Sequence, residues 1–95
     1  MRLEWDERKR AANRAKHGVD FADAEHVLTD ARALTIPDDR KGEARSVTLG
    51  MGPLGRLLVV VHTRRADAVR VISIRKANAR ERAKYPDERH GGDRP

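Results

Sequence analysis

The residues best suited to chemistry in this sequence are cations, histidines and one tyrosine, and most of them follow residue 44. Arginine can hold two phosphate or carboxylate oxygens at once through its planar fork, and histidine gains and loses a proton near neutral pH. These residue types favour binding and reaction of an anionic group. The candidates are Lys16, His17, Arg45, His62, Arg70, Arg75, Lys76, Arg80, Glu81 and Tyr85.

Arg75 is the first choice as a phosphate clamp. It closes an apolar run that is typical of a core strand, and Lys76 and Arg80 follow it closely. Packing in an apolar core does not explain a charged side chain at this position. Arg45, Arg70, Lys76 and Arg80 are further candidates for contacts with phosphate, while Lys16, His17, His62 and Tyr85 are candidates for a catalytic role.

Each candidate also has a structural interpretation. Lys16 and His17 precede Gly18 and can stabilise the negative end of a helix. His62 can be a hydrogen-bonded residue at a strand end. The remaining interpretations are that Arg70 pairs with Asp67 across a hairpin, that Glu81 caps a helix and that Tyr85 packs on the sheet.

Charge is concentrated in one part of the chain. Residues 44–85 hold ten Lys or Arg and two acids, whereas the rest holds eleven Lys or Arg and thirteen acids. Such a distribution favours a surface that meets phosphates or an acidic partner. The chain has no cysteine, which excludes disulfides and thiolate chemistry, and we expect no metal site and no cofactor. The absence of a signal-like or membrane-length apolar run predicts a cytoplasmic protein.

Two helices are expected early in the chain. After a short strand at Arg2–Trp5, Asp6 is a good N-cap and Gly18 suits the left-handed position that ends a helix. A second helix is expected to begin at Asp20, with Phe21 and Val27 on its apolar side. Residues 33–36 are ambiguous and can form a short extended piece.

Three strands and a last helix are expected next. Residues 45–51 form one strand, and the apolar runs 57–61 and 69–74 form a hairpin that continues to Lys76. In the second hairpin strand, strict alternation places Val69, Val71, Ser73 and Arg75 on one side and Arg70, Ile72, Ile74 and Lys76 on the other. Asn78 and Glu81 have the spacing of a capping box, and Pro86 ends the helix.

The sequence therefore predicts an α+β fold with a small antiparallel sheet and the order β-α-α-β-β-β-α. One domain is expected over residues 1–86, followed by a mobile tail at 87–95. If Arg65 and Ala66 form the centre of the hairpin turn, His62 lies opposite Val69, some 20 Å from Arg75 at about 3.3 Å per residue. At most one of these two side chains can then act on a given phosphate.

The opening EWDERKRAANRAKHGVDFADA resembles the BrnT family of type II toxins. The matching residues are Trp5, Asp6, Lys9, Asn13, Lys16, His17, Gly18, Phe21 and Ala24. The later part matches as well, at Arg45, Gly50, the strand Leu57–Val61 and the stretch RVISIRKANARERAKY from Arg70 to Tyr85. Ile74, in place of the family's usual Ala, is the one departure noted in that stretch. The resemblance covers about residues 2–85.

This resemblance implies a fold like that of the RelE ribonuclease toxins and the activity of an RNA endonuclease that stalls translation. It also implies a BrnA-type antitoxin with a ribbon-helix-helix part, which binds operator DNA as a complex with the toxin. Cleavage would most simply use the 2′-hydroxyl of the RNA, without metal, with a base, an acid and cations supplied by the protein. Two alternatives are a non-catalytic basic module that binds nucleic acid or antitoxin and acts in autorepression, and a degenerate toxin.

Overall fold

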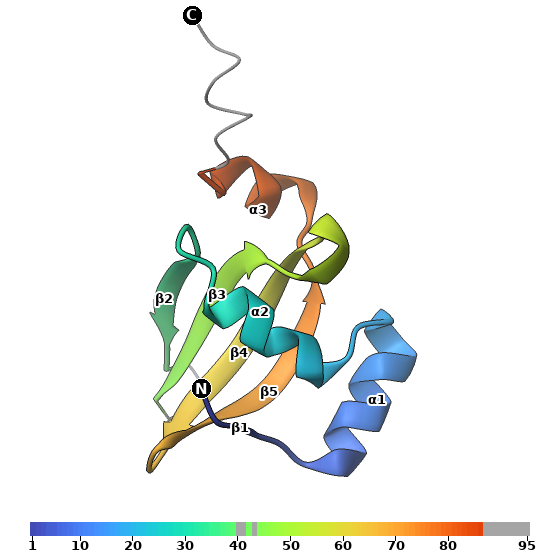
Figure 1. The fold of residues 1–95 in the computed structure, drawn as a ribbon, viewed down its shortest axis with the longest axis vertical. Helices are drawn as coiled ribbons and strands as arrows, with labels where there is room; N and C mark the ends of the chain where they lie inside the picture. The colour runs from blue at the N-terminus through green and yellow to red at the C-terminus, as the bar shows by residue number, and fades with distance from the viewer. Residues whose placement is uncertain (40–41, 43, 87–95) are drawn as a thin grey trace, which may run out of the picture.

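The computed structural model describes residues 1–39, 42 and 44–86, and the expected tail at 87–95 lies outside this part. The described residues form three helices and a five-stranded sheet, with two short 3₁₀ turns (Figure 1). In chain order the elements are β1 (Leu3–Glu4), α1 (Glu7–His17), a 3₁₀ turn (Phe21–Asp23), α2 (Ala24–Leu28), β2 (Leu34–Asp38), β3 (Arg45–Met51), a 3₁₀ turn (Pro53–Gly55), β4 (Leu57–Arg65), β5 (Ala68–Lys76) and α3 (Ala79–Lys84).

The predicted limits of α1 are confirmed. The carboxylate of Asp6 accepts hydrogen bonds from the amides of Arg8 and Lys9, at 2.8 and 3.2 Å. Gly18 has a φ of 71° and its amide donates to the carbonyl of Arg14, so it ends the helix in the left-handed conformation that glycine adopts without strain.

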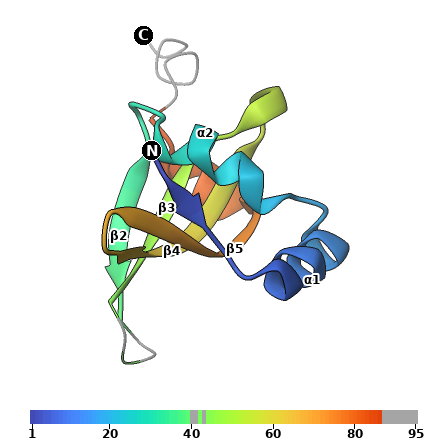
Figure 2. The same ribbon diagram turned by 60° about the horizontal axis from the view of Figure 1, so that its bottom comes forward.

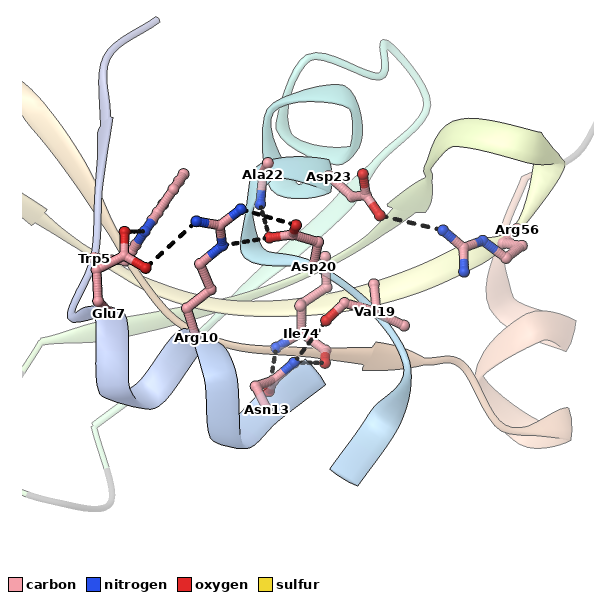
Figure 3. A network of polar contacts seen from close by, with 10 residues as sticks. All are labelled: Trp5, Glu7, Arg10, Asn13, Val19, Asp20, Ala22, Asp23, Arg56 and Ile74. Atoms are coloured by element: carbon pink, nitrogen blue, oxygen red, sulfur yellow. Dashed lines mark hydrogen bonds and ion pairs between the residues drawn. The ribbon is translucent and has the colours of Figure 1, made fainter. Parts of the chain in front are cut away.

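The second helix begins later than expected. Asp20 does cap a turn, because its carboxylate accepts from the amide of Ala22, but this turn is 3₁₀ and α2 begins at Ala24. Arg10 fixes the turn to α1 through two hydrogen bonds to Asp20, at 2.8 and 3.0 Å (Figure 3). The guanidinium of Arg10 holds the pKa of Asp20 at about 2.

The expected sheet is wrong in two respects. Leu34–Asp38 is a strand, so four strands follow the helices, and the strand order across the sheet is β1-β5-β4-β3-β2. The sheet is also mixed, because β1 pairs in parallel with β5 while the other neighbours are antiparallel. Two helices separate β1 from β2, and Figures 1 and 2 show this crossover returning the chain to the far edge of the sheet.

The hairpin between β4 and β5 has a different register from the expected one. Ala66 and Asp67 form its turn, His62 lies opposite Val71, and the register shifts between Val61 and His62. Ile72 is the extra residue of this β-bulge. A bulge changes which side chains share a face, so the predicted alternation fails and Val71 and Ile74 both belong to the core beneath the helices.

Two apolar clusters pack on opposite faces of the sheet. On the first face, the segment that leads from α1 through the 3₁₀ turn into α2 contributes Val19, Phe21, Ala24 and Val27, which pack on Leu58, Val60, Val71 and Ile74. On the second face, Tyr85 and Ala77 pack on Leu49 and Val59. The start of β4 is therefore covered on both faces, at Leu58 and Val59, which are both nearly fully buried. No helix in the described part is both long and apolar enough to cross a membrane.

Candidate active site

The structure distributes the predicted site residues over several parts of the fold. Paired residues on antiparallel strands share a face, so the register assigns Arg45, Arg70 and Arg75 to the face opposite α1 and α2, here called the open face. His62 lies on the helix-covered face. Lys16, His17, Lys76 and Arg80 lie on α1, at the end of β5 and on α3.

Arg75 and Glu81 form a two-pronged ion pair on the open face. The Nη1 and Nη2 atoms of Arg75 donate to Oε1 and Oε2 of Glu81, at 2.9 and 2.8 Å. The hydrogen bonds from Arg75 hold the pKa of Glu81 at about 2, and those to Glu81 raise the pKa of Arg75. The fork predicted to hold phosphate is thus already occupied by a carboxylate, which has similar geometry.

Glu81 has a second role that was predicted. Its Oε1 accepts from the amide of Asn78 at 2.9 Å, and Oδ1 of Asn78 accepts from the amide of Glu81 at 2.8 Å. This capping box begins α3 and fixes the carboxylate beside Arg75. The two roles share one side chain, so the start of α3 and the arginine fork are positioned together.

The pair lies in an open groove of about 570 Å³. Its apolar floor is formed by Val47, Val59 and Val61, and Ile36 lies on its rim, with 63% of the residue exposed. The acidic lining residues are Asp38, Asp39 and Glu81. Asp38 lies opposite Arg45 in the register and Glu81 binds Arg75, so charges of both signs are interspersed along this groove.

Arg70, another candidate arginine of the open face, is engaged elsewhere. Arg70 donates to Oε2 of Glu4 at 3.1 Å, which joins β5 to β1. The alternative in which Arg70 pairs with Asp67 is wrong, because Asp67 binds Arg2 at 2.8 Å.

Tyr85 is buried against the open face rather than exposed to a ligand. Its hydroxyl donates to Oδ2 of Asp30 at 2.6 Å, and the amide of Met51 donates to the same oxygen at 2.8 Å. Burial raises the pKa of Asp30, but these hydrogen bonds more than offset it and hold the pKa below its ordinary value. The structural interpretation of Tyr85, packing on the sheet, is confirmed by its 5% exposure.

His62 is separated from Arg75 by the sheet itself. Its Nε2 atom lies 2.8 Å from Oγ1 of Thr48, which in turn lies 2.7 Å from Oγ1 of Thr35. Burial lowers the pKa of His62, and the charge of Arg64 lowers it further. The assumed register was wrong, but the conclusion that His62 and Arg75 cannot share one phosphate stands, because they lie on opposite faces.

Lys16, Lys76 and Arg80 are exposed, and His17 is half-buried. Asn13 donates to the carbonyl of Ile74 at 2.8 Å and accepts from its amide at 3.2 Å, which fixes α1 along β5 (Figure 3). Lys16 follows Asn13 by one turn of α1, and Lys76 follows Ile74 by two residues. Figure 1 shows the C-terminal end of α1 directed toward the end of β5 that carries Lys76.

The pairing of Arg75 with Glu81 was missed from the sequence, although both residues were named. The signal was available, because a strand ending in Arg was followed six residues later by the acid of a capping box. In the part of the chain that the structure describes, no three His, Cys, Asp or Glu side chains gather as a metal site would require.

Comparison with known proteins gives a family and a structural relative. A search of curated proteins gives no match. The crystal structure of the Brucella abortus ribonuclease toxin, BrnT, has a TM-score of 0.66 and 34% sequence identity, covering 82% of this chain and 97% of that one. The family model for the BrnT ribonuclease toxin of type II toxin–antitoxin systems matches residues 5–81. The chain therefore belongs to the BrnT family of ribonuclease toxins of type II toxin–antitoxin systems.

Proposed function

We propose that this BrnT-family toxin is an endonuclease that cleaves RNA at the groove containing Arg75 and Glu81. The 2′-hydroxyl of the RNA would be the attacking group, and no metal would take part. The observation that carries the proposal is the ion pair between these residues. It places a cationic fork and a carboxylate 2.8 Å apart in a groove open to solvent. These are the two groups that this reaction needs at phosphorus and at the attacking hydroxyl.

The ion pair allows a phosphate of the RNA to replace Glu81 as the partner of Arg75. While Arg75 binds Glu81, the pKa of Glu81 is about 2 and the carboxylate is a weak base. A scissile phosphate that takes over the fork of Arg75 frees Glu81, whose pKa then rises toward its ordinary value of about 4.3. Glu81 can then accept the proton of the 2′-hydroxyl while Arg75 stabilises the charge on the phosphorane. The departing 5′-oxygen takes a proton from water.

Toxins of this class imply an antitoxin, and we propose a BrnA-type partner with a ribbon-helix-helix part. It would cover the open face, block the groove and bind operator DNA as a complex with the toxin. The cations at the end of β5, beside the groove, favour an acidic segment of the partner. The relation of this sheet to the RelE toxins, inhibition of translation as the outcome, and cytoplasmic action belong to the same proposal.

One observation favours the alternative of a non-catalytic binding module. Both terminal nitrogens of Arg75 are held by Glu81, and the Tyr85 hydroxyl is held by Asp30, so two side chains predicted for chemistry are engaged within the protein. Under this alternative, Arg75 contributes to RNA affinity and not to cleavage.

The test is cleavage of RNA by purified protein in the presence of EDTA. We expect cleavage by wild type, near-complete loss with Arg75→Ala and Glu81→Gln, and partial loss with Arg75→Lys, which keeps the charge but not the fork. Arg65→Ala is the matched control, because Arg65 is an exposed cation at the end of β4. Urea unfolding of each variant shows whether a loss comes from misfolding.

Growth on induced expression extends the test to the antitoxin. Arrest by wild type, relieved by Arg75→Ala and by co-expression of the neighbouring open reading frame, is the expected result. Cleavage retained by a folded Arg75→Ala variant, or abolished by EDTA in wild type, contradicts the mechanism. Binding of RNA without cleavage by folded wild type supports the binding module instead.

A further inference from the structure

A second pocket lies at the end of the sheet where β5 passes into α3. It has a volume of about 260 Å³ and is lined by Gly55, Arg56, Leu57, Lys76, Ala77 and Arg82. Three cations reach it from three different segments, and among the residues that the structure describes no carboxylate lines it. We call it the basic pocket. We propose that it binds a backbone phosphate of the RNA substrate adjacent to the phosphate held at Arg75, a role that rests on the proposed function.

Two of the three cations are held in place by the protein. Arg56 binds Oδ2 of Asp23 through Nη2 at 3.2 Å (Figure 3), and its Nε donates to the carbonyl of Pro53 at 3.4 Å. Arg82 donates through Nη1 to the carbonyl of Ala77 at 2.8 Å. A guanidinium has five N–H donors, so each anchored fork retains donors for a ligand, and less side-chain entropy is lost on binding.

The charge of the basic pocket differs from that of the Arg75 groove. The groove is lined by Arg75 with three carboxylates, whereas the basic pocket is lined by three cations and has Asp23 as the acid bound to one of them. The pocket therefore attracts an anion more strongly than the groove does. A phosphate group suits its size and its donors, and Arg in particular matches phosphate geometry.

The basic pocket and the groove are joined by consecutive residues. On β5, Arg75 lines the groove and Lys76 lines the basic pocket. On α3, Glu81 lines the groove and Arg82 lines the basic pocket. Arg75 and Lys76 lie on opposite faces of the sheet because they are consecutive on β5, so an RNA strand that meets both places crosses the end of β5 from one face to the other.

An apolar side chain stands beside the basic pocket. Leu54, next to Gly55, has a φ of 65° and is 90% exposed. A non-glycine residue in this conformation is strained, and such strain gathers at functional sites. Leu54 offers an apolar surface to the sugar or base attached to the phosphate in the pocket.

The experiment measures binding of a short 2′-O-methyl oligoribonucleotide by fluorescence anisotropy over a salt series. This probe lacks the attacking hydroxyl, so binding is measured without cleavage. Each phosphate contact with a single strand contributes about 0.7 to the slope of log K against log salt. We expect the double variant Lys76→Ala/Arg82→Ala to lower the magnitude of the slope by about 0.7. Leu54→Gly should weaken binding without changing the slope.

The matched control is the double variant Arg64→Ala/Arg65→Ala, which removes the same charge from two exposed residues at the end of β4. If the salt slope falls equally in both double variants, the proposal that the basic pocket binds a phosphate is wrong. The single variant Lys76→Gln tests the pocket without altering α3, and an unchanged slope there together with an unchanged affinity also counts against it.

The proposed function and the basic pocket fail separately. If Lys76→Ala/Arg82→Ala lowers the salt slope as expected but the wild type does not cleave RNA, the nuclease mechanism alone is wrong. Wild type that cleaves RNA in an Arg75-dependent way, with a slope insensitive to Lys76 and Arg82, overturns the pocket alone. If inorganic phosphate shifts the amide resonances of the pocket while the RNA slope stays insensitive to these residues, the pocket binds the free anion and the proposal is wrong.

Discussion

Asn13 takes the place of a strand partner at the outer edge of β5. β1 pairs with β5 at Val69 and Arg70, and four residues further along, the amide and carbonyl of Ile74 are both bound by the Asn13 side chain. The side-chain Nδ2 of Asn13 also donates to the carbonyl of Val19 at 3.2 Å. One buried side chain therefore satisfies backbone groups of two segments and fixes α1 against the sheet.

Replacing Asn13 with Ala leaves buried backbone groups without partners. Three such groups lose their partner, and each costs about 1–3 kcal/mol, so Asn13→Ala should lower the free energy of unfolding by at least about 3 kcal/mol. Urea unfolding measures this, with Lys16→Ala as a control on an exposed position of the same helix. A loss as small as that of the control would show that water replaces the amide.

His62 should make stability depend on pH. Its pKa is lowered in the folded protein, so the unfolded chain binds more protons between the folded value and the unfolded value of about 6.5. The contribution of neutral His62 is therefore complete above that unfolded value and is lost as the pH falls toward the folded one.

The substitution His62→Gln keeps a hydrogen-bonding group for Thr48 and does not titrate. We expect the unfolding free energy of the variant to vary less than that of wild type as the pH is lowered from 8 to 5. Urea unfolding at several pH values gives the comparison. Equal pH dependence in both proteins would assign the titration to other groups.

At the scale of elements, the turn before β4 contains a residue, Leu54, whose backbone strain a substitution can relieve. Leu54 has a φ of 65°, a conformation in which L-residues other than glycine are disfavoured by about 1–2 kcal/mol. Glycine relieves this strain but loses more entropy on folding. We expect Leu54→Gly to stabilise the protein by about 0.5–1 kcal/mol.

Thermal and urea unfolding of Leu54→Gly test this directly. The residue is 90% exposed, so the substitution removes almost no packing. Destabilisation would mean that the leucine side chain has contacts of greater value than the strain. If the variant is both more stable and weaker in RNA binding, the strain at Leu54 is retained for function.

Elements defined by local chemistry were predictable. Asp6 and Gly18 define α1, and Asn78 with Glu81 begins α3, because capping depends on residues within one turn. β2 was only an ambiguous extended piece, since it contains Pro37 and its first four residues are exposed, which gives no alternation of burial. The parallel pairing of β1 and the bulge at Ile72 depend on packing between distant segments, and the sequence carried no local signal for them.

The same distinction, between local chemistry and packing of distant segments, explains how much of the candidate site could be predicted. Arg75 was identifiable because a cation ended an apolar run, whereas its position opposite Glu81 depends on how α3 turns back on the sheet. The sequence separated His62 from Arg75 by distance along the hairpin, whereas in the structure they lie on opposite faces of the sheet. The bulge decides which residues of β5 face the helices, and a one-residue insertion in pairing cannot be read from alternation alone.

At the scale of the whole molecule, the sheet separates a structural face from a functional one. The 3₁₀ turn at Phe21–Asp23 and α2 cover the first face with the larger apolar cluster, α1 lies along β5, and the short helix α3 covers only part of the second face. The open face is left with a groove, and the excess of cations lies around the end of β5. This arrangement makes the position of α3 decisive for both the groove and the basic pocket.

α3 is too short to be stable alone, because isolated helices of fewer than about 12 residues are marginal in water. It spans six residues, Ala79–Lys84, and is retained by its capping box, by Arg75 and by Tyr85. The Tyr85 hydroxyl reaches Asp30, and Asp30 also binds the amide of Met51 at the end of β3. One carboxylate thus ties α3 to β3 and to the segment that follows α2.

The substitution Tyr85→Phe should loosen α3 without unfolding the sheet. Phenylalanine keeps the apolar contacts, and the lost hydrogen bond to a charged group is worth about 1.5–3 kcal/mol. Hydrogen exchange measured by NMR should therefore accelerate for the amides of α3 while those of β4 keep their rates. Lys84→Ala, an exposed change on the same helix, should leave both unchanged. Equal acceleration in α3 and β4 would mean that the helix opens only when the whole molecule unfolds, and that the groove is not separately mobile.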